Sequence, residues 1–513
     1  MAQDQSAVID WLMDPATHGG DRPRHVETHG AHVVLAGDKA YKIKRAVKYD
    51  YMDFSTLRQR RDMLCRELDL NQPAAPGIYL DVVPVVRTDG GLAFGDGAAP
   101  GAEAVEWVLR MRRFPREDEL AAVAERGALD DALAEELGRS VARYHARAPR
   151  RDGDGAAMMA AIVDELDTAF AGMTAELGAT PVARFGDAVA AALAGQGPRL
   201  TARSDEGRLR RCHGDLHLRN LVLIDGRPVP FDALEFDEVL GTCDVLYDMA
   251  FLVMDLLHRD LARPATLALN AWLFEAGGDE DAALACLPFF LGIRAGIRAM
   301  VDVQAGRAAD DAAGANEDAR AYLSQALRFL APPPPRLIAV GGPSGTGKTT
   351  LARRLAPGLG AAPGAVHLRS DLERKHLAGV DPLTRLPATA YAPTASRAVH
   401  DRLCARAETL LAAGQSVILD ATFLDAHERR AAAELARRAG VPFDGIWLEA
   451  PQDVLTARVD ARRGDASDAD AAVVAGQMAR DPGAIDWTRL QSGGPMDDLE
   501  ARARVRLDIA RPG

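Results

Sequence analysis

The segment from Gly342 to Thr349 reads GPSGTGKT and has the residue types and spacing that bind a chain of phosphates. Glycines allow the backbone to curl until successive N–H groups point at one anion, and Lys348 adds a fixed positive charge. Thr349 offers a hydroxyl to a divalent cation, and the N-terminus of a helix adds partial positive charge. The residues expected to line the loop are Gly342, Pro343, Ser344, Gly345, Thr346, Gly347, Lys348, Thr349 and Thr350.

The sequence on each side of this loop supports the same interpretation. Residues 337–340 form a short apolar run typical of a strand, and residues 350–355 have helical spacing. A glycine-rich turn that arose by chance would not have strand, helix, lysine and threonine all in register. The segment is therefore a complete P-loop, and it predicts a nucleoside triphosphate site that uses ATP and Mg²⁺.

A second cluster of polar residues lies in the segment HGDLHLRN at residues 213–220, and Asp232 follows after an apolar hairpin. Phosphoryl transfer needs a carboxylate that orients or deprotonates the acceptor hydroxyl, and this task fits Asp215. It also needs oxygen ligands that hold Mg²⁺ on the triphosphate, which fits Asn220 and Asp232. The alternative is an Asp- and His-rich surface loop in an acidic protein.

Two lysines upstream strengthen the first interpretation of this cluster. In kinase-like lobes a strand lysine contacts the α- and β-phosphates and is held by a helix glutamate. Residues 33–44 predict a hairpin that carries Lys42 and Lys44, and the helical pattern that follows carries Glu67. Both lysines lie on the same strand face, so periodicity does not choose between them. The alternative is a pair of solvated lysines on an edge strand.

Downstream of the P-loop, residues 365–375 predict a strand that ends in an acid, Asp371, followed by the start of a helix. The carboxyl ends of strands line the ligand crevice in open α/β sheets. Asp371 is therefore expected to accept a proton from an acceptor hydroxyl, with Arg374 one turn on to bind a substrate anion. The alternative role for Asp371 is helix N-cap, for which Ser370 competes.

A buried parallel strand is predicted at residues 416–423, with Asp420 towards its end. An acid at this place supports Mg²⁺ through Thr349 or through water.

A helix predicted at residues 454–463 carries Arg458 and Arg462 on one face, at i and i+4. In lid-type kinases such arginines close over the triphosphate and neutralise the charge that develops during transfer. The alternative is a solvated, arginine-rich helix that is balanced by the nearby aspartates at 465, 468 and 470.

The elements that position these residues divide into two domains. Four consecutive prolines at residues 332–335 exclude both a helix and a central strand. We predict an α+β, kinase-like domain over residues 1–330, with a small mixed sheet followed by a helical lobe. A linker at residues 331–335 then leads to an α/β P-loop domain with a parallel sheet over residues 336–513.

Composition bounds the class of protein. The chain has 513 residues and a net charge of −13, which argues against general or stable nucleic-acid binding. Its five cysteines are scattered and form no CxxC pair, which indicates reduced thiols in the cytoplasm. The N-terminus has no export pattern, and no apolar run approaches the length of a membrane span, so no membrane contact is expected.

Residues 25–300 resemble the aminoglycoside phosphotransferase-like branch of the protein-kinase fold, through HGDLHLRN, FDALEF and the segment AGDKAYKIKRAVKYDYMDFSTLRQRR. The whole chain resembles bacterial proteins in which such a domain is fused to an AAA-type P-loop kinase. The resemblance implies that Asp215 is the catalytic base. It also implies that Asn220 and Asp232 are metal ligands, and that Lys42 or Lys44 works with Glu67 as the phosphate clamp.

This sequence departs from the protein-kinase pattern in two places. No GxGxxG loop is present, and the Asp-Phe-Gly triplet is replaced by Asp232-Ala233-Leu234. Glu235, just beyond the triplet, is either an additional metal or substrate ligand or a surface acid. Asp248 is expected to brace the catalytic loop. The C-terminal part is similar to P-loop kinases grouped with polynucleotide kinase, gluconate kinase and zeta-type toxins.

The sequence thus predicts two ATP- and Mg²⁺-dependent phosphotransferase domains. Each is expected to act on a hydroxyl of a small molecule, nucleotide or sugar, and the acceptors and the oligomeric state are left open. A nucleotide-sensing regulatory protein with one silent domain is the alternative, which the altered triplet keeps open. An antibiotic-resistance kinase is a weaker third reading, because such enzymes usually stand alone.

Overall fold

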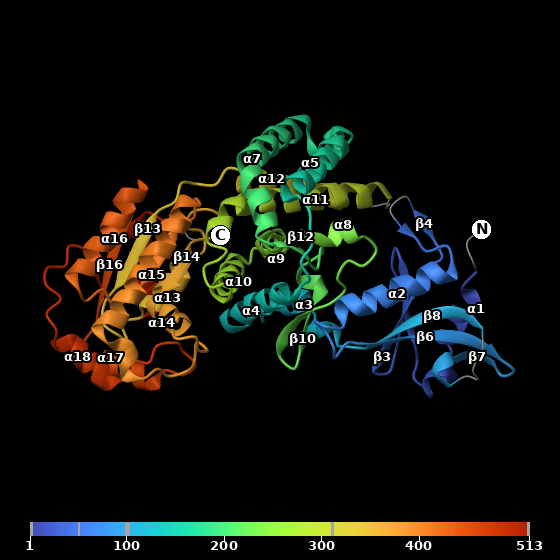
Figure 1. The fold of residues 1–513 in the computed structure, drawn as a ribbon, viewed down its shortest axis with the longest axis horizontal. Coiled ribbons are helices and arrows are strands. Elements are labelled where there is room, and N and C mark those ends of the chain that lie inside the picture. Colours follow the sequence, from blue (N-terminus) through green and yellow to red (C-terminus); the bar gives the residue numbers. More distant parts are fainter. Residues whose placement is uncertain (1–3, 50–51, 98–102, 309–311, 510–513) are drawn as a thin grey trace. The chain divides into compact units, whose positions relative to one another are not determined.

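The computed structural model describes residues 4–49, 52–97, 103–308 and 312–509 (Figure 1). The chain forms two compact units. The first unit comprises Met1–Asp152 and Gly207–Asp248, and the second comprises Gly153–Glu206 and Met249–Gly513. Most of the predicted helical lobe therefore belongs to the same unit as the P-loop. The predicted domain boundary at the proline linker, residues 331–335, stays a prediction.

The first unit is built on a six-stranded sheet of order β1-β2-β3-β8-β6-β7. The predicted hairpin is present, because β2 pairs antiparallel with β3 across Gly37 and Asp38. Since β3 also pairs with β8, the alternative of lysines on an edge strand is wrong. The strands are β1 (Arg24–Glu27), β2 (Ala31–Ala36), β3 (Lys39–Lys44), β6 (Tyr79–Thr88), β7 (Gly91–Phe94) and β8 (Ala104–Arg112).

Helix α2 (Leu57–Asn71) packs against β6 and β8 of this sheet and carries Glu67 towards the lysines of β3. Its start is fixed by a capping box, in which the Thr56 side chain accepts from the Gln59 N–H and the Gln59 side chain accepts from the Thr56 N–H. The first unit also contains α1 (Ser6–Leu12), β4 (Lys48–Tyr49), β5 (Met52–Asp53), α3 (Leu120–Glu125) and α4 (Asp131–Arg147).

The segment 209–244 of the first unit carries the predicted catalytic loop between two small antiparallel ladders. β9 (Leu209–Arg211) pairs with β12 (Thr242–Asp244), and β10 (Leu221–Ile224) pairs with β11 (Arg227–Pro230). A short helix, α8 (Glu238–Gly241), precedes β12. Because β10 begins immediately after Asn220 and β11 ends two residues before Asp232, the hairpin returns these two residues to the same end.

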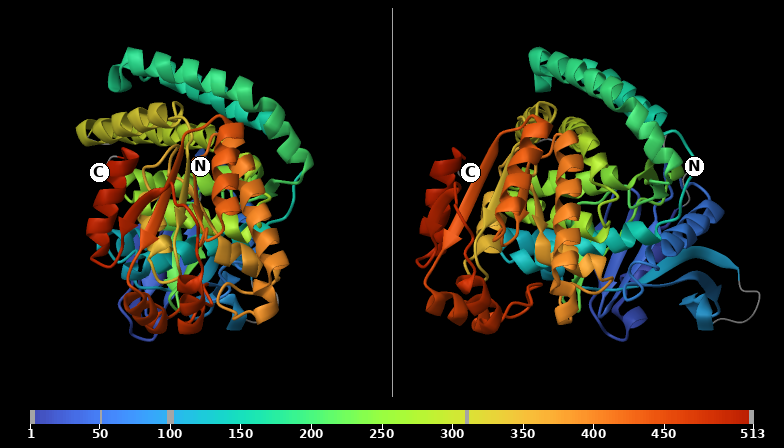
Figure 2. Two further views of the ribbon diagram at one scale, coloured as in Figure 1. Left: turned by 90° about the vertical axis from the view of Figure 1, so that its left-hand side faces the viewer. Right: turned by 60° about the vertical axis from the view of Figure 1, so that its left-hand side comes forward.

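The second unit contains a five-stranded parallel sheet of order β14-β15-β13-β16-β17 with helices on both faces (Figure 2). The predicted fold class of this part is confirmed. Its strands are β13 (Leu337–Gly341), β14 (Val366–Arg369), β15 (Val417–Asp420), β16 (Phe443–Glu449) and β17 (Thr488–Gln491). Its helices are α13 (Lys348–Leu355), α14 (Ser370–Leu377), α15 (Pro393–Ala412), α16 (Ala426–Ala439), α17 (Gln452–Ala461), α18 (Ala471–Ala479) and α19 (Met496–Leu507).

The other helices of the second unit come from the middle of the chain. They are α5 (Gly155–Ala171), α6 (Thr174–Leu177), α7 (Ala179–Asp205), most of α9 (Val245–His258), α10 (Ala262–Glu275), α11 (Leu287–Ala308) and α12 (Ala312–Phe329). Helix α10 covers the free edge of β14. The Asn270 side chain donates to the Ala365 carbonyl at 3.3 Å and accepts from the His367 N–H at 2.7 Å, and Thr266 donates to the Pro363 carbonyl at 2.8 Å.

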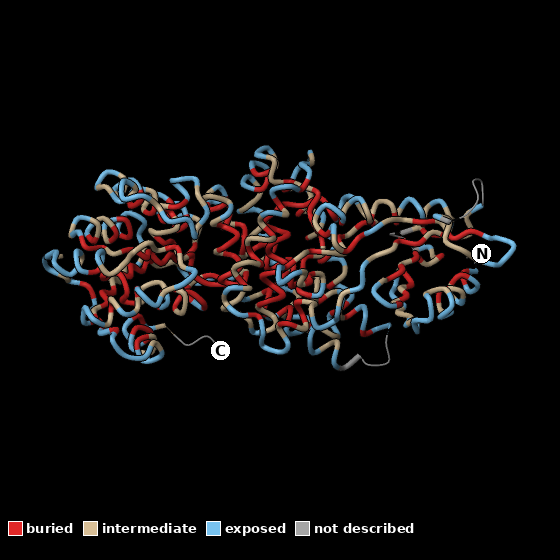
Figure 3. Tube along the Cα trace, turned by 90° about the horizontal axis from the view of Figure 1, so that it is seen from below, coloured by how far each residue is buried: buried red, intermediate tan, exposed pale blue. Residues whose placement is uncertain are grey.

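Buried segments follow the strands and the inner helices of each unit, whereas loops and outer helix turns are exposed (Figure 3). One helical stretch, Ala282–Ala308, is long and apolar enough to meet the criterion for a membrane span. An apolar run of 18 residues within it is 72% buried inside the protein. This corrects the expectation that no apolar run approaches such a length. A buried core helix meets the same criterion, because it is apolar on every side.

Candidate active sites

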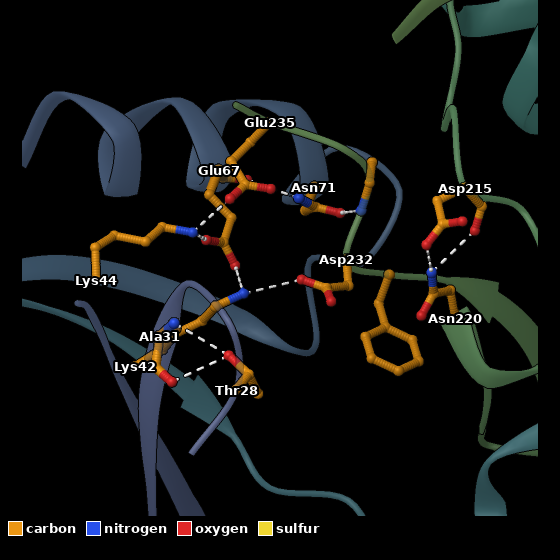
Figure 4. A network of polar contacts seen from close by, with 12 residues as sticks. Thr28, Ala31, Lys42, Lys44, Glu67, Asn71, Asp215, Asn220, Asp232 and Glu235 are labelled. Atoms are coloured by element: carbon orange, nitrogen blue, oxygen red, sulfur yellow. Dashed lines mark hydrogen bonds and ion pairs between the residues drawn. The ribbon is translucent and has the colours of Figure 1, made fainter. Parts of the chain in front are cut away.

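Lys42 lies at the centre of a polar network in the first unit (Figure 4). Its ammonium donates to Glu67 at 2.7 Å and to Asp232 at 2.9 Å, although Asp232 lies 190 residues away in the sequence. Burial alone would lower the pKa of Lys42, but the carboxylates of Asp232 and Glu67 outweigh it and raise that pKa well above its usual range. Lys42 is therefore charged at neutral pH.

Lys44 has a different environment, which sequence periodicity did not distinguish. Its side chain is only 2% exposed, and its ammonium contacts Glu67 at 2.6 Å and Glu235 at 2.5 Å. Glu67 thus receives one lysine on each carboxylate oxygen, with Lys42 on the other. The geometry makes Lys42 the lysine beside the predicted metal ligand and Lys44 a buried counter-charge, and the phosphate-clamp role of Lys42 stays a prediction.

Asp232 is held by residues that the sequence analysis missed. Its backbone N–H donates to the Tyr79 hydroxyl at 2.9 Å, and the next N–H, of Ala233, donates to the Asn71 side chain at 2.8 Å. Asp232 adopts a φ of +60°, a left-handed conformation that costs a non-glycine residue free energy. The charge of Lys42 holds the pKa of Asp232 below its usual value, so its carboxylate is ionised. Its side chain is 45% exposed.

Asp215 and Asn220 lie together, as Figure 4 shows. The Asn220 amide nitrogen donates to the Asp215 carboxylate and to the Asp215 backbone carbonyl, both at 2.9 Å. The Phe231 N–H donates to the Asn220 carbonyl at 3.0 Å, which anchors the catalytic loop to the segment that carries Asp232. The structure thus gathers these predicted residues around one hairpin, and their catalytic roles stay predictions.

Asp248 braces the predicted catalytic loop, as the sequence analysis expected. The fully buried Asp248 carboxylate accepts from the Gly214 N–H at 2.9 Å and the His213 N–H at 3.2 Å. The His213 ring contacts the Phe231 carbonyl at 2.8 Å and the Asp215 N–H at 3.3 Å, an arrangement that needs its neutral form with the proton on Nε2. Burial lowers the pKa of His213, which favours that form.

The P-loop of the second unit has the backbone that its glycines allow. Gly342, Gly345 and Gly347 all have positive φ angles, of +131°, +86° and +88°. Lys348 bends back and donates to the Pro343 carbonyl at 3.0 Å. Burial lowers the pKa of Lys348, and the Asp420 carboxylate opposes this shift.

The predicted metal ligands of the second unit are in direct contact, because the Thr349 hydroxyl donates to the Asp420 carboxylate at 2.6 Å. His367 on the neighbouring strand contacts the same oxygen at 3.1 Å. Burial alone would raise the pKa of Asp420, but His367, Lys348 and Arg369 outweigh it and lower this pKa to about 2. Asp420 is thus an ionised carboxylate beside the P-loop, and its role as a metal ligand stays a prediction.

Asp371 lies in the first turn of α14, whose N-cap is Arg369, so Asp371 is not the N-cap. Arg374 is partly committed to contacts within the protein. Its guanidinium donates to the Ala390 carbonyl at 2.6 Å and lies 4.7 Å from the centre of the Tyr391 ring. Its Nε is buried without a hydrogen-bond partner among the described residues, and the predicted role in binding a substrate anion stays a prediction.

The predicted pairing of Arg458 and Arg462 on one helix face is wrong. Helix α17 ends at Ala461, and Arg462 has an extended backbone, with φ −64° and ψ +138°. Arg458 nevertheless reaches the P-loop, because it lies 3.4 Å from the Gly345 carbonyl. The positive charge of Arg462 contributes, after burial, to lowering the pKa of Lys348 in the P-loop. Its Nη1 is buried and unpartnered within the described part of the chain.

Several polar residues that contact the P-loop, Asp420 or one another in the second unit were given no site role from the sequence. They are His367, Arg369, Lys375, Tyr391, Asp468 and Gln477. Two of them could have been found from the sequence. His367 and Arg369 lie two residues apart, and so on one face, of a strand whose carboxyl end was expected to face the ligand. The others lie in segments whose partners are far away in the sequence.

The fold and the two sites define a class of protein, in which a protein-kinase-like domain and a P-loop kinase domain share one chain. A family model described as an AAA domain matches residues 337–481, the region of the predicted P-loop domain. The chain is 31% identical over 484 residues to the uncharacterized protein Rv2004c of Mycobacterium tuberculosis, and the match covers 92% of each chain. The protein belongs to the same family as this mycobacterial protein and its counterpart in Mycobacterium bovis.

Two solved structures are similar to parts of the chain. A choline/ethanolamine kinase family protein from Mesorhizobium loti is 17% identical, with a TM-score of 0.40, and the match covers 64% of this chain and 98% of that chain. A sugar kinase from Janibacter is 25% identical, with a TM-score of 0.26, and the match covers 35% of this chain and 97% of that chain.

Proposed function

We propose that this protein is an ATP- and Mg²⁺-dependent phosphotransferase with two separate kinase sites. Each site transfers the γ-phosphoryl group of ATP to a hydroxyl group of a small molecule, nucleotide or sugar. The observation that supports the proposal most directly is the contact of Lys42 with both Glu67 and Asp232. A cation between a helix carboxylate and a metal-binding carboxylate is the arrangement that kinase-like lobes use for ATP.

At the first site, Asp215 accepts the proton of the acceptor hydroxyl. The hydroxyl oxygen bonds to the γ-phosphorus while the bond from that phosphorus to the β–γ bridging oxygen breaks, and ADP leaves with the bond's electron pair. Lys42 neutralises the triphosphate. The Asn220 amide fixes the Asp215 carboxylate at 2.9 Å, so the base is oriented before the acceptor arrives.

At the second site, Asp371 has the corresponding role as base, and the P-loop amides and Lys348 hold the phosphates. Arg458 and Arg462 neutralise the charge that spreads over the transferred group. The balance of bonds is the same as at the first site, and neither site forms a phospho-enzyme.

The donor sets fit Mg²⁺, a hard cation that prefers oxygen ligands. Asn220 and Asp232 would hold it at the first site, and Thr349 and Asp420 at the second. Asp420 is suited to this role because its pKa of about 2 keeps it ionised. When bound, the cation would offset the negative charge of the phosphates.

The proposal is tested by counting ATP sites in the full chain with isothermal titration calorimetry in the presence of MgCl₂. The parent should bind two ATP molecules. Lys348→Ala should bind one, Lys42→Met should bind one, and the double variant should bind none. A matched control is Lys48→Met, which removes an exposed lysine paired with Asp53 in the same unit. If the parent and the Lys348→Ala variant bound equal numbers of ATP molecules, the proposed second site would be wrong.

The alternative of a nucleotide-sensing protein with one silent domain makes a different prediction for turnover. A silent first site would bind ATP but release no ADP above the level of Asp215→Ala with any hydroxyl acceptor of a metabolite library. The acceptor identities, a cytoplasmic location and the absence of stable nucleic-acid or membrane binding belong to the proposal as expectations.

A further inference from the structure

Residues 462–470, which we call the lid segment, connect α17 to α18 beside the P-loop. Sequence analysis gave its aspartates the alternative role of balancing neighbouring arginines. In the structure they pair instead with cations of residues 369–391, which we call the α14 segment because it contains that helix. The pairs are Arg369 with Asp465, Lys375 with Asp468 and Arg385 with Asp470.

Asp468 accepts three hydrogen bonds from the α14 segment. One of its carboxylate oxygens accepts from the Lys375 ammonium at 2.6 Å, the Tyr391 hydroxyl at 2.6 Å and the Leu386 N–H at 2.9 Å. Lys375 is only 1% exposed, and the Asp468 carboxylate, together with the Thr384 carbonyl, offsets the cost of burying its ammonium. Burial alone would raise the pKa of Asp468, but these three donors outweigh it and lower that pKa, so the carboxylate is ionised.

The two helices that flank the lid segment contact the P-loop. In α17, before the segment, Arg458 lies 3.4 Å from the Gly345 carbonyl. In α18, after the segment, the side-chain oxygen of Gln477 accepts from the Ser344 N–H at 2.7 Å. The lid segment and its flanking helices therefore join the loop that would hold the phosphates of ATP to the segment that carries Asp371 and Arg374.

We propose that Asp468 is a positioning residue, which fastens the lid segment to the α14 segment so that Arg458, Arg462 and Asp371 are held together. The proposal rests on the proposed function of the P-loop site. Asp468 itself acts only through Lys375, Tyr391 and the Leu386 amide. If the lid segment were detached from the α14 segment, Arg462 would lie beside the γ-phosphate for less of the time. Loss of Asp468 should therefore lower turnover more than it weakens ATP binding.

The test uses the full chain with Asp215→Ala, so that turnover is measured only at the P-loop site. Hydrogen exchange is followed in peptides covering residues 384–391 and 462–479, and ATP hydrolysis is measured as phosphate release. In Asp468→Asn, we expect exchange in both peptides to rise by about tenfold or more, since a buried charge-assisted contact is lost. We expect kcat to fall by about tenfold or more while KM for ATP changes by less than about threefold.

A second variant and a control complete the experiment. Tyr391→Phe removes one of the three donors and should give a smaller change of the same kind, which keeps the test decisive if Asp468→Asn fails to fold. Glu434→Gln makes the same carboxylate-to-amide change in an exposed pair with Arg437 and should behave as the parent. Faster exchange in only one of the two peptides, or an unchanged kcat, would overturn the proposal.

Failure of the proposed function has a separate signature. If calorimetry detects no Lys348-dependent ATP binding, the P-loop assignment is wrong, whereas the exchange data still report whether Asp468 joins the two segments. If ATP binds and turns over normally in Asp468→Asn, the P-loop assignment stands and the positioning role is wrong.

Discussion

Lys42 and Lys44 lie two residues apart on β3, but their side chains have different surroundings. Lys42 contacts the half-exposed Asp232, whereas Lys44 is enclosed between Glu67 and Glu235. Removal of one partner from a buried ion pair leaves an uncompensated charge, which is strongly destabilising. Replacement of Lys44 should therefore mainly reduce stability, whereas replacement of Lys42 should mainly reduce ATP binding.

We predict that Lys44→Met lowers the free energy of unfolding of the first unit by about 3–5 kcal/mol, because the buried Glu235 loses its lysine partner and Glu67 loses one of its two. Lys42→Met should lose ATP at the first site with a smaller loss of stability. Thermal unfolding by calorimetry, paired with ATP titration, separates the two effects. Lys48→Met, at an exposed pair, should change stability by less than about 1 kcal/mol. Equal stability of the Lys42 and Lys44 variants would contradict the assignment.

The folding stability of the first unit is predicted to depend on pH through His213. Its folded-state pKa is lowered by burial, so the unfolded chain binds more protons than the folded chain as pH falls below 6.5. Stability should therefore be greatest above pH 6.5 and decrease towards pH 5, by at most about 1.4 kcal/mol per pH unit for one proton.

The measurement is urea denaturation between pH 5 and pH 7.5. His213→Gln should flatten the slope, because the amide does not titrate, whereas His29→Gln at an exposed histidine should keep the slope of the parent. A steeper slope in His213→Gln would show that the sign is wrong.

At the scale of elements, the free edge of the parallel sheet is closed by a helix from the middle of the chain. Strand β14 leads into α14 and carries His367, which contacts Asp420. Asn270 of α10 accepts from the outer His367 N–H of this strand, and Asn270 and Thr266 donate to the Ala365 and Pro363 carbonyls just before it. An unsatisfied backbone group that stays buried costs free energy comparable to a lost hydrogen bond.

We predict that Asn270→Ala destabilises the second unit by about 1–3 kcal/mol, since the His367 N–H loses its acceptor. Thermal unfolding measures the loss. Hydrogen exchange at residues 365–369 locates it, and exchange there should rise while the first unit is unchanged. Asn316→Ala on α12 is the matched control. If residues 365–369 exchanged as slowly in the variant as in the parent, α10 would not be the element that closes the edge.

At the scale of the molecule, the compact units do not follow the order of the chain. The second unit combines residues 153–206 with everything from residue 249 onward, so helices on both sides of the proline run belong to it. The buried Arg406 shows this dependence, because it contacts Asp281 before the prolines at 2.8 Å and Glu373 after them at 2.6 Å.

We predict that a fragment of residues 336–513 is less stable than the same residues in the full chain, because it lacks the cover of β14 and the partner of Arg406. Size-exclusion chromatography should show self-association of the fragment, and its thermal unfolding should begin at a lower temperature. A monomeric fragment with the unfolding temperature and ATP affinity of the intact P-loop site would contradict this expectation.

Much of the fold and of both sites follows from local sequence. The P-loop, the HGDLHLRN loop, the hairpin at Gly37 and the ends of the parallel strands all depend on residues a few positions apart. Turns, caps and periodicity are set at this range, where neighbouring residues restrict the backbone directly. The same reasoning placed Asp420 at the end of a strand and Thr349 in the P-loop, and the structure has their side chains in contact.

Only the tertiary structure decided the pairings of distant side chains. The different surroundings of Lys42 and Lys44 depend on the position of Asp232, 190 residues further along the chain from Lys42. The partners of Asp468, the early end of α17 and the cover of β14 likewise depend on segments that meet only after folding. Periodicity assigns a side chain to a face, but the charge that it meets there is set by packing between segments far apart in the sequence.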